Sequence, residues 1–188
     1  MDAMQICADF WTALGVVWAV GLMFRKPTQE RAGMGQRVVY GIVVIVAFWV
    51  MFSGRVPSGW LHKHLYERTQ WTDWTGVALT ALGVLLAVWA RFFLGRNWSG
   101  SVTVKVGHEL IRTGPYHFVR HPIYTGLLLA MLGTGMVRAR VSSAIGFALL
   151  FVGFWMKMRI EESFMRKTFG GQHEDYARTT GALVPRFW

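Results

Sequence analysis

Long apolar runs, separated by short polar stretches, make up most of the chain. Five of them are long enough, or nearly long enough, to cross a bilayer, which takes about 20 helical residues. They cover residues 8–24, 38–52, 74–94, 123–137 and 142–158. Little amphipathic sequence remains that would cover five buried helices in a water-soluble protein. The pattern therefore predicts an all-α, multi-pass integral membrane protein with five transmembrane helices.

The composition agrees with a bilayer as the main surroundings. Hydrophobic residues make up 53% of the chain and charged residues 16%, whereas soluble domains carry about 25% charged residues. The 10 tryptophans and 13 phenylalanines suit the membrane–water interface. A chain of 188 residues without a Ser/Gly-rich linker predicts one membrane domain. It would have three helices in residues 1–94 and a core with a helical hairpin and a cytoplasmic end in residues 95–188.

Three smaller features add local detail. The first residues lack the basic region and the cleavage site of a signal peptide, so we expect them to lead into the first helix. Cys7 is the one cysteine, which excludes an internal disulfide and a cysteine-based zinc site. Val102, Val104 and Val106 alternate with polar residues, which predicts a short strand or an extended loop.

The distribution of basic residues predicts the orientation. The net charge of +10 does not indicate nucleic-acid binding, because no recognised motif and no basic helical stripe accompanies it. With the N-terminus outside, fifteen of the 20 lysines and arginines fall on the cytoplasmic side, as the positive-inside rule requires. We therefore expect a cytoplasmic C-terminus, with the polar segments 95–122 and 157–188 on the cytoplasmic side.

The last two apolar runs are joined by a short turn, VRARV, and are expected to form a helical hairpin. At 1.5 Å per residue, residues 124–138 climb about 21 Å and residues 142–159 descend about 26 Å, so the chain returns to its starting level. This brings together Arg120, His121, Tyr124, Arg159, Glu161 and Glu162. An interfacial collar of snorkelling and anchoring side chains would explain the first three alone. The convergence of acids, cations, an imidazole and a phenol is instead typical of a binding site.

Other chemistries lack their residues. The pairs His62/His64 and His108/Glu109 do not complete a metal-hydrolase motif, and no metal is expected. The sequence has no nucleophile elbow and no P-loop. The GTG at residues 133–135 lies in an apolar helix, where small residues favour close helix packing rather than dinucleotide binding.

Residues 94–187 resemble a known family. The stretches LGRNWSGSVTVKVGHELIRTGPYHFVRHPIYTG, EES and VPRF resemble the isoprenylcysteine carboxyl methyltransferase family of integral membrane methyltransferases and its bacterial relatives. The resemblance implies an S-adenosylmethionine-dependent transferase, with S-adenosylhomocysteine as product, in a prokaryotic inner membrane and with its active site facing the cytoplasm. It also implies two partners, the lipid bilayer and a lipophilic methyl acceptor, and neither metal nor nucleic acid.

The same resemblance implies roles for individual residues. The cofactor would be bound by His108, Glu109, Leu110, Ile111, Gly114, Pro115, Tyr116, His121, Pro122, Tyr124, Glu161 and Glu162. Arg120 and Arg159 would meet a carboxylate on the acceptor, and with Glu162 they form the expected catalytic set. Methyl transfer from a sulfonium is an in-line displacement of an activated leaving group, so the protein mainly supplies alignment. No role follows for Asn97, Trp98 or Arg186.

Several acceptors and two other functions stay open. The main interpretation is O-methylation of an isoprenylcysteine carboxylate or a related small lipophilic substrate, with phospholipid N-methylation and thiol S-methylation as alternatives on the same fold. A non-catalytic lipid-binding protein would keep the helices, but the acidic pair would weaken an anionic-lipid patch. A membrane reductase of the sterol type would need nicotinamide binding, and the chain is short for it. The sequence does not indicate an oligomeric state.

Overall fold

The computed structural model describes residues 2–23, 28–31, 33–53, 59–95, 103–105 and 110–186. Helices dominate these residues, as the apolar pattern predicted. The elements are α1 (Ala3–Leu22), β1 (Thr28–Arg31), α2 (Met34–Phe52), the 3-10 helix η1 (Gly59–His62), α3 (Gln70–Leu94), β2 (Thr103–Lys105), α4 (Pro115–Phe118), α5 (Pro122–Arg138), α6 (Val141–Phe169) and α7 (Gly171–Thr179). The two strands pair antiparallel with each other, so the extended segment expected around Val104 is confirmed for residues 103–105.

Each predicted apolar run coincides with a helix, the first of them as far as Leu22. Over the described residues, α1, α2, α3 and α6 are long and apolar enough to cross a membrane by length and composition. The helix of the fourth run, α5, has 17 residues and is shorter than these four. Large apolar side chains such as Ile45, Leu85 and Trp89 point outward from α2 and α3, as expected for a surface that faces lipid. The all-helical membrane fold is therefore confirmed, while the number of crossings stays a prediction.

The end of the last long helix differs from the sequence prediction. The apolar run ends at 158, but α6 continues to Phe169. The added residues, RIEESFMRKTF, are mostly good helix formers, and they need no apolar environment once they have left the bilayer. The helix stops at Gly170, whose φ of 49° is readily adopted only by a residue without a side chain. This extension carries Glu161 and Glu162 on a regular helix rather than on a loop.

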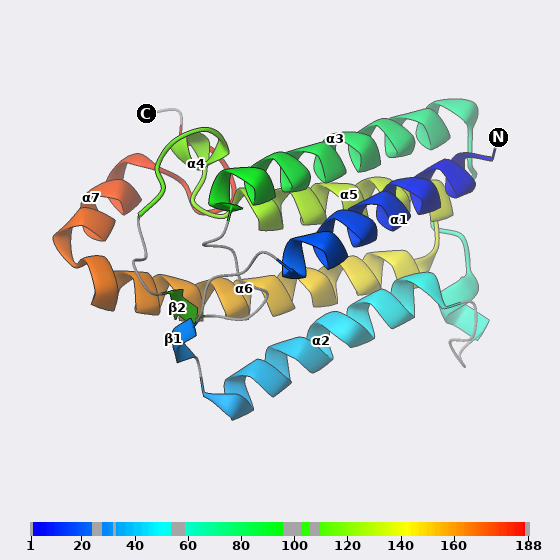
Figure 1. The fold of residues 1–188 in the computed structure, drawn as a ribbon. Helices are drawn as coiled ribbons and strands as arrows, with labels where there is room; N and C mark the ends of the chain where they lie inside the picture. Colours follow the sequence, from blue (N-terminus) through cyan, green and yellow to red (C-terminus); the bar gives the residue numbers. More distant parts are fainter. Residues whose placement is uncertain are drawn as a thin grey trace.

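The long helices run up and down in two layers (Figure 1). α3 packs along α5, and α1 lies against both, while α2 packs along α6. The closest approach is between α3 and α5, where Gly83 faces Gly126 and Gly76 faces Gly133. A side chain at Gly83 would place its Cβ 2.3 Å from the backbone nitrogen of Ala130, so the small residues allow backbone contact.

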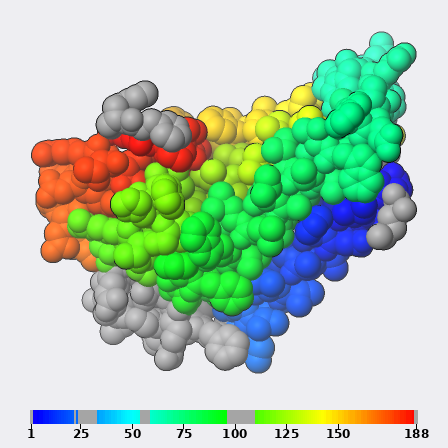
Figure 2. Space-filling model, turned by 90° about the horizontal axis from the view of Figure 1, so that it is seen from above, coloured from blue at the N-terminus to red at the C-terminus, as the bar shows by residue number. Residues whose placement is uncertain are grey.

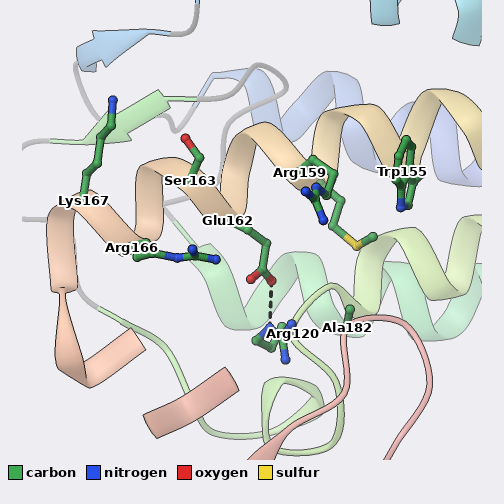
Figure 3. A pocket seen from close by; sticks show the side chains of 9 residues that line it. Arg120, Trp155, Arg159, Glu162, Ser163, Arg166, Lys167 and Ala182 are labelled. Carbon is green, nitrogen blue, oxygen red and sulfur yellow. Dashed lines mark hydrogen bonds and ion pairs between the residues drawn. The ribbon is translucent and has the colours of Figure 1, made fainter. Parts of the chain in front are cut away.

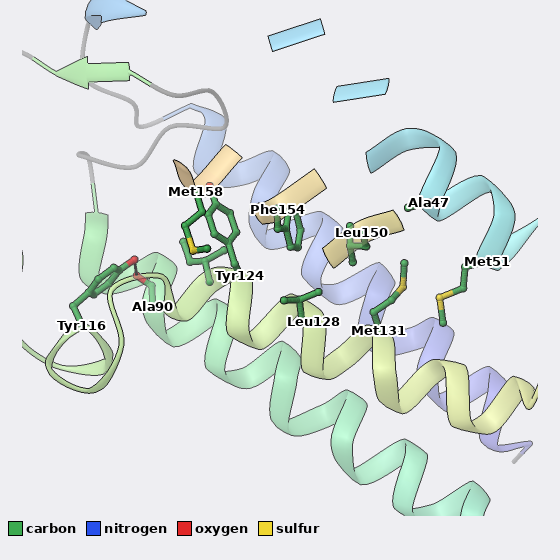
Figure 4. Close-up of a cluster of buried hydrophobic side chains, with 11 residues drawn as sticks. Ala47, Met51, Ala90, Tyr116, Tyr124, Leu128, Met131, Leu150, Phe154 and Met158 are labelled. Carbon is green, nitrogen blue, oxygen red and sulfur yellow. Dashed lines mark hydrogen bonds between the residues drawn. The ribbon is translucent and has the colours of Figure 1, made fainter. Parts of the chain in front are cut away.

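A buried apolar cluster joins the two layers (Figure 4). Met131 and Leu128 of α5 meet Leu150 and Phe154 of α6, and Met51 of α2 closes the cluster on one side. At the other side the cluster continues past the aromatic ring of Tyr124 and Met158 to Tyr116 and Ala90. The packing therefore fixes the start of α5 against the polar half of α6.

The polar elements gather at one end of the molecule. α4, α7 and the residues that follow α7 lie together there, opposite the end at which α1 begins and η1 lies (Figures 1 and 2). The up-and-down order of α1, α2, α3, α5 and α6 puts the start of α1 and the end of α6 at opposite ends. This arrangement agrees with the predicted odd number of passes.

Candidate active site

The entry to α5 is built from three short pieces. Gly114 has a φ of 59° and turns the chain into the single turn of α4. Val119 is extended, and His121 forms the N-cap of α5 with Pro122 in the first helical position. Proline fits there because its missing N–H would have had no partner. The turn therefore presents Arg120 and His121 at the mouth between α5 and α6.

Residues 180–183 follow α7 and form the closing segment. This segment is hydrogen-bonded to the residues at the start of α5. The backbone nitrogens of Arg120 and His121 donate to the carbonyls of Gly181 (2.9 Å) and Ala182 (3.0 Å). The hydroxyl of Thr125 donates to the carbonyl of Leu183 at 2.8 Å. These bonds satisfy backbone groups that a loop would otherwise leave unpaired, and they fix where the two side chains point.

Glu162 is the centre of an ion network. The Arg120 Nε donates to its Oε1 at 2.7 Å, and the His121 Nε2 lies 2.9 Å from the same oxygen. The His173 Nε2, on α7, lies 3.5 Å from Oε2. Arg120 also donates through Nη1 to the carbonyls of Ala177 and Thr180. The bond from Arg120 to Glu162 crosses from the α5 entry to α6 (Figure 3).

Glu161 belongs to a second, aromatic part of the site. The Tyr124 hydroxyl donates to its Oε1 at 2.7 Å, and the His121 Nδ1 lies 3.6 Å from its Oε2. The ring of Tyr124 stacks on His121, with centroids 5.5 Å apart, and on Phe154 at 4.9 Å. His121 thus touches both carboxylates and links the ion network to the aromatic stack.

The two histidines of the site differ in their protonation. Burial alone would lower the pKa of His121, but the hydrogen bonds to Glu161 and Glu162 and their negative charges outweigh it, so its pKa is raised. Burial lowers the pKa of His173, and the charge of Glu162 offsets this only in part. The site therefore favours a charged His121 beside a neutral His173.

An open cleft of about 690 Å³ lies beside the network (Figure 3). It is lined by Arg120, Trp155, Met158, Arg159, Glu162, Ser163, Arg166, Lys167 and Ala182. Among these described residues four side chains are basic and one is acidic, and the acid is already paired with Arg120. The Arg159 guanidinium lies over the Trp155 ring, 5.8 Å from its centroid. The cleft is therefore suited to a ligand with an anionic group.

The structure brings together most of the residues that the sequence placed in one site. Arg120, His121, Tyr124, Glu161 and Glu162 form one contact network, so the predicted return of the hairpin is confirmed. Arg159 is beside them on the cleft wall rather than in the network.

The other predicted residues lie around this network or beyond the described part of the chain. Gly114, Pro115, Tyr116 and Pro122 belong to the entry of α5, and Ile111 packs against the apolar cluster. Leu110 is half-buried beside Ile111. His108 and Glu109, and also Asn97 and Trp98, lie outside the described residues.

Sequence reasoning missed residues that reach the site from elsewhere. His173 and Tyr176 are buried on α7, and the Tyr176 hydroxyl donates to the carbonyl of Tyr116. Arg112 donates to the carbonyl of Gln172 at 2.6 Å and lies over the Tyr176 ring. The i, i+3 spacing of His173 and Tyr176 in a polar helix indicates that they share one face, but it does not indicate that this face meets the site.

Comparison with known proteins places the chain in a family. A sequence model described as phospholipid methyltransferase matches residues 71–172, more than half of the chain. The chain belongs to the phospholipid methyltransferase family. The match covers α5, α6 and all of α3 except Gln70, and it includes Arg120, His121 and Glu162 of the ion network, but it leaves out α1, α2 and His173. The expected resemblance to membrane methyltransferases is thereby confirmed.

Individual relatives of this family member are similar over part of their length. Protein-S-isoprenylcysteine O-methyltransferase B of Arabidopsis thaliana is 30% identical over 118 residues, which is 61% of this chain and 60% of the relative. Nickel-cobalt-cadmium resistance protein NccN of Alcaligenes xylosoxydans xylosoxydans is 32% identical over 121 residues, which is 63% of this chain and 55% of that protein. The matches thus span less than two thirds of these relatives.

A solved structure has the same fold. The eukaryotic intramembrane Ras methyltransferase ICMT (isoprenylcysteine carboxyl methyltransferase) matches with a TM-score of 0.57 at 23% sequence identity. The match covers 82% of this chain and 53% of the solved chain. At this identity the likeness establishes the fold of this phospholipid methyltransferase family member.

Proposed function

We propose that the chain is an S-adenosylmethionine-dependent methyltransferase that acts at the membrane surface on a lipophilic acceptor. The observation that carries the proposal is the meeting of two adjacent carboxylates, Glu161 and Glu162, with Arg120, His121 and Tyr124 at the mouth between α5 and α6. Membership of the phospholipid methyltransferase family supports the reaction class. The site contains acids and cations in contact within a partly desolvated region, which is the usual setting of a functional site.

The residues of the site fit the cofactor. Carboxylates suit its ammonium group and its ribose hydroxyls, and Glu161 and Glu162 supply two of them. The Nδ1 of His173 is buried without a hydrogen-bond partner among the described residues, and a bound ligand or water would satisfy it. The proposed cofactor residues are His108, Glu109, Leu110, Ile111, Gly114, Pro115, Tyr116, His121, Pro122, Tyr124, Glu161 and Glu162.

The main task of the protein in this reaction is to align the acceptor with the methyl group. When bound, S-adenosylmethionine supplies an activated methyl group on a sulfonium. Arg120 donates hydrogen bonds to Glu162, to the carbonyl of Ala177 on α7 and to the carbonyl of Thr180 in the closing segment. Its side chain therefore forms a fixed wall of the cleft. Arg159 stands on the opposite part of the cleft beside Trp155. The two guanidinium groups would orient a carboxylate toward the methyl group.

The charge of the cleft favours an acceptor with an anionic group. Four basic residues and one paired acid line it over the described residues, and a cationic amine would be repelled there. This supports O-methylation of an isoprenylcysteine carboxylate or a related lipophilic acid over the N-methylation of an amine phospholipid. Thiol S-methylation is less disfavoured, because a thiolate is also an anion. We place the cleft on the cytoplasmic face of a prokaryotic inner membrane, since the cofactor is cytosolic.

Cofactor binding is the first test. Isothermal titration of S-adenosylhomocysteine into the detergent-solubilised chain should give saturable binding. Glu162→Ala and Glu161→Gln should each weaken it about 10- to 100-fold, because each removes a charge-assisted hydrogen bond in a site with little water. Glu67→Ala, an exposed acid outside the site, is the matched control and should bind like the wild type. A folded wild-type chain that binds neither S-adenosylmethionine nor S-adenosylhomocysteine overturns the proposal.

The type of methylated atom is the second test. Membranes that contain the chain are incubated with methyl-labelled S-adenosylmethionine, and the lipid and protein fractions are treated with alkali. A methyl ester releases volatile labelled methanol, whereas N-methyl and S-methyl products keep their label. Volatile label that depends on Arg159 would support a carboxylate acceptor. Alkali-stable label in the phospholipid fraction would instead favour the N-methylation alternative.

A further inference from the structure

Lys157 is a cation held on the inner side of α6, one turn before Glu161. Its side chain is half-buried. Its ammonium lies 5.3 Å from the centre of the Tyr124 ring on α5 and 5.7 Å from the centre of the Tyr40 ring on α2. A lysine near a membrane boundary usually extends its ammonium toward water. Here the ammonium lies instead against two aromatic rings from different helices.

Tyr40 is a rigid partner for this cation. It is 6% exposed, and it packs against Met156, Ile160 and Phe164 of α6. α2 runs along α6 over much of its length (Figure 1), so the ring cannot swing away without separating the two helices. Tyr40 also lies outside the residues that the family model matches, 71–172. Tyr40 therefore reaches Lys157 from a helix that the family match does not include.

Tyr124 connects the cation to the site. Its ring is stacked on both His121 and Phe154, and its hydroxyl donates to Glu161 at 2.7 Å. Lys157 and Glu161 are also four residues apart on one helix, a spacing that puts them on the same face. Lys157 is thus next to Glu161 along α6 and next to its hydrogen-bond donor across the helix interface.

We propose that Lys157 is a positioning residue, held between Tyr40 and Tyr124, that places a positive charge beside Glu161 and orients it for the cofactor, and so makes α2 part of the cofactor site. This inference rests on the proposed function, because it assumes that Glu161 binds the cofactor. A cation over an aromatic face is attracted to it, more strongly where water is excluded. Glu161 already shares His121 with Glu162, so without Lys157 it would lose a second positive neighbour, and its ionised form would be less favoured.

The test compares five single variants and one double variant of the full chain in detergent micelles. Lys157→Met removes the cation, and Lys157→Arg keeps one that also stacks on aromatic rings. Tyr40→Leu removes the ring, and Tyr40→Phe keeps it. Lys63→Met, in an exposed position next to η1, makes the same change in net charge far from the site. Affinity for S-adenosylhomocysteine is measured by titration, and folding by thermal unfolding of the empty protein.

We expect Lys157→Met to weaken binding about tenfold, a size typical of residues that share one network. Lys157→Arg should recover most of the affinity, and Tyr40→Phe and Lys63→Met should bind like the wild type. Tyr40→Leu should weaken binding too, and the double variant with Lys157→Met should be no weaker than Lys157→Met alone. Such non-additivity would be absent if Tyr40 only packed against α6.

The outcomes separate this inference from the proposed function. A wild-type chain without cofactor binding overturns the proposed function and this inference with it. Wild-type binding with equal or tighter affinity in Lys157→Met overturns the role of Lys157 alone. An equal loss in Lys63→Met, or no recovery in Lys157→Arg, has the same consequence. Should Lys157→Met fail to fold, Tyr40→Leu decides: unchanged affinity in that variant overturns the inference.

Discussion

At the scale of single residues, His121 links the two carboxylates of the site. Its two ring nitrogens lie 3.6 Å from Glu161 and 2.9 Å from Glu162. Burial opposes the charged form of His121, but both hydrogen bonds favour it, and its pKa is raised. The folded protein therefore binds the His121 proton more tightly than the unfolded chain does. His121 stabilises the fold fully below its ordinary pKa of about 6.5, and this contribution is lost as pH rises through the raised value.

The raised pKa of His121 predicts that the stability of the protein depends on pH. The thermal midpoint of the empty protein should fall as pH increases from about 6.5, because the His121 contribution disappears there. His121→Gln should remove that part of the slope, since glutamine still forms hydrogen bonds but does not titrate. His117→Gln, which changes an exposed histidine on α4 four residues before His121, is the control. Parallel curves for wild type and His121→Gln would contradict the assignment.

The residues of the network were predictable to different extents. Arg120, His121, Tyr124, Glu161 and Glu162 could be brought together from sequence, because two apolar runs of similar length and the short turn between them determine where the chain returns. His173 could not, since its position depends on the direction that the chain takes after Gly170 and on the return of the closing segment. The path of the chain after Gly170 is determined by backbone turns and by buried contacts between residues that are distant in sequence.

At the scale of elements, the contact between α3 and α5 depends on glycines. A Cβ at Gly83 would lie 2.4 Å from the carbonyl oxygen of Gly126 and 2.3 Å from the nitrogen of Ala130. Backbone atoms cannot move aside as a flexible side chain can, so the helices would have to separate. Gly83→Ala should lower the free energy of unfolding by about 1–3 kcal/mol, measured by thermal or denaturant unfolding in micelles. Gly15→Ala, where the Cβ meets nothing within 4 Å, should leave it unchanged or raise it slightly.

A buried polar chain attaches α1 to α3 and α5. The Trp11 indole donates to the Thr134 hydroxyl at 2.9 Å, Thr134 lies 3.2 Å from the hydroxyl of Thr80, and the Cys7 thiol lies 3.5 Å from Thr80. Such bonds between membrane helices are typically worth roughly 1 kcal/mol. Their loss should therefore let α1 open more often.

Cys7 makes this opening measurable, because it is the one cysteine in the sequence and is fully buried. Thr134→Val removes the acceptor for Trp11 and should speed the reaction of Cys7 with a maleimide about fivefold, the equivalent of roughly 1 kcal/mol. Thr12→Val, on the exposed side of α1, should not change the rate. A Thr134→Val rate equal to that of the wild type would mean that the polar chain does not hold α1 in place.

The sequence predicted the existence of the long helices better than their limits. Apolar runs of this length indicate helices whatever their partners, so all five were found. The ends depend on local chemistry that hydropathy does not measure. α1 begins at Ala3 because the Asp2 side chain caps it, and α6 passes beyond its apolar run because charged residues continue a helix well.

At the scale of the whole molecule, the positions of the two ends connect the fold to the function. The order of the five long helices puts the start of α1 and the polar end with α7 on opposite sides (Figure 1). The distribution of basic residues independently predicts that the polar end lies in the cytoplasm. An N-terminus outside and a polar end in the cytoplasm require an odd number of crossings. This number is odd only if α5, with 17 residues, crosses the bilayer like its longer neighbours.

Accessibility of single cysteines tests this arrangement in the native membrane. On a Cys7→Ser background, Glu67→Cys and Glu174→Cys each place one thiol at an exposed position, before α3 and on α7. A membrane-impermeant maleimide added to intact cells should label the first, and the second should react only in inverted vesicles. Because the site shares an end of the molecule with α7, this result would put the cleft on the side where S-adenosylmethionine is available. Labelling of both thiols from one side would require an even number of crossings between them, and the proposed access of the cofactor would then need a different orientation.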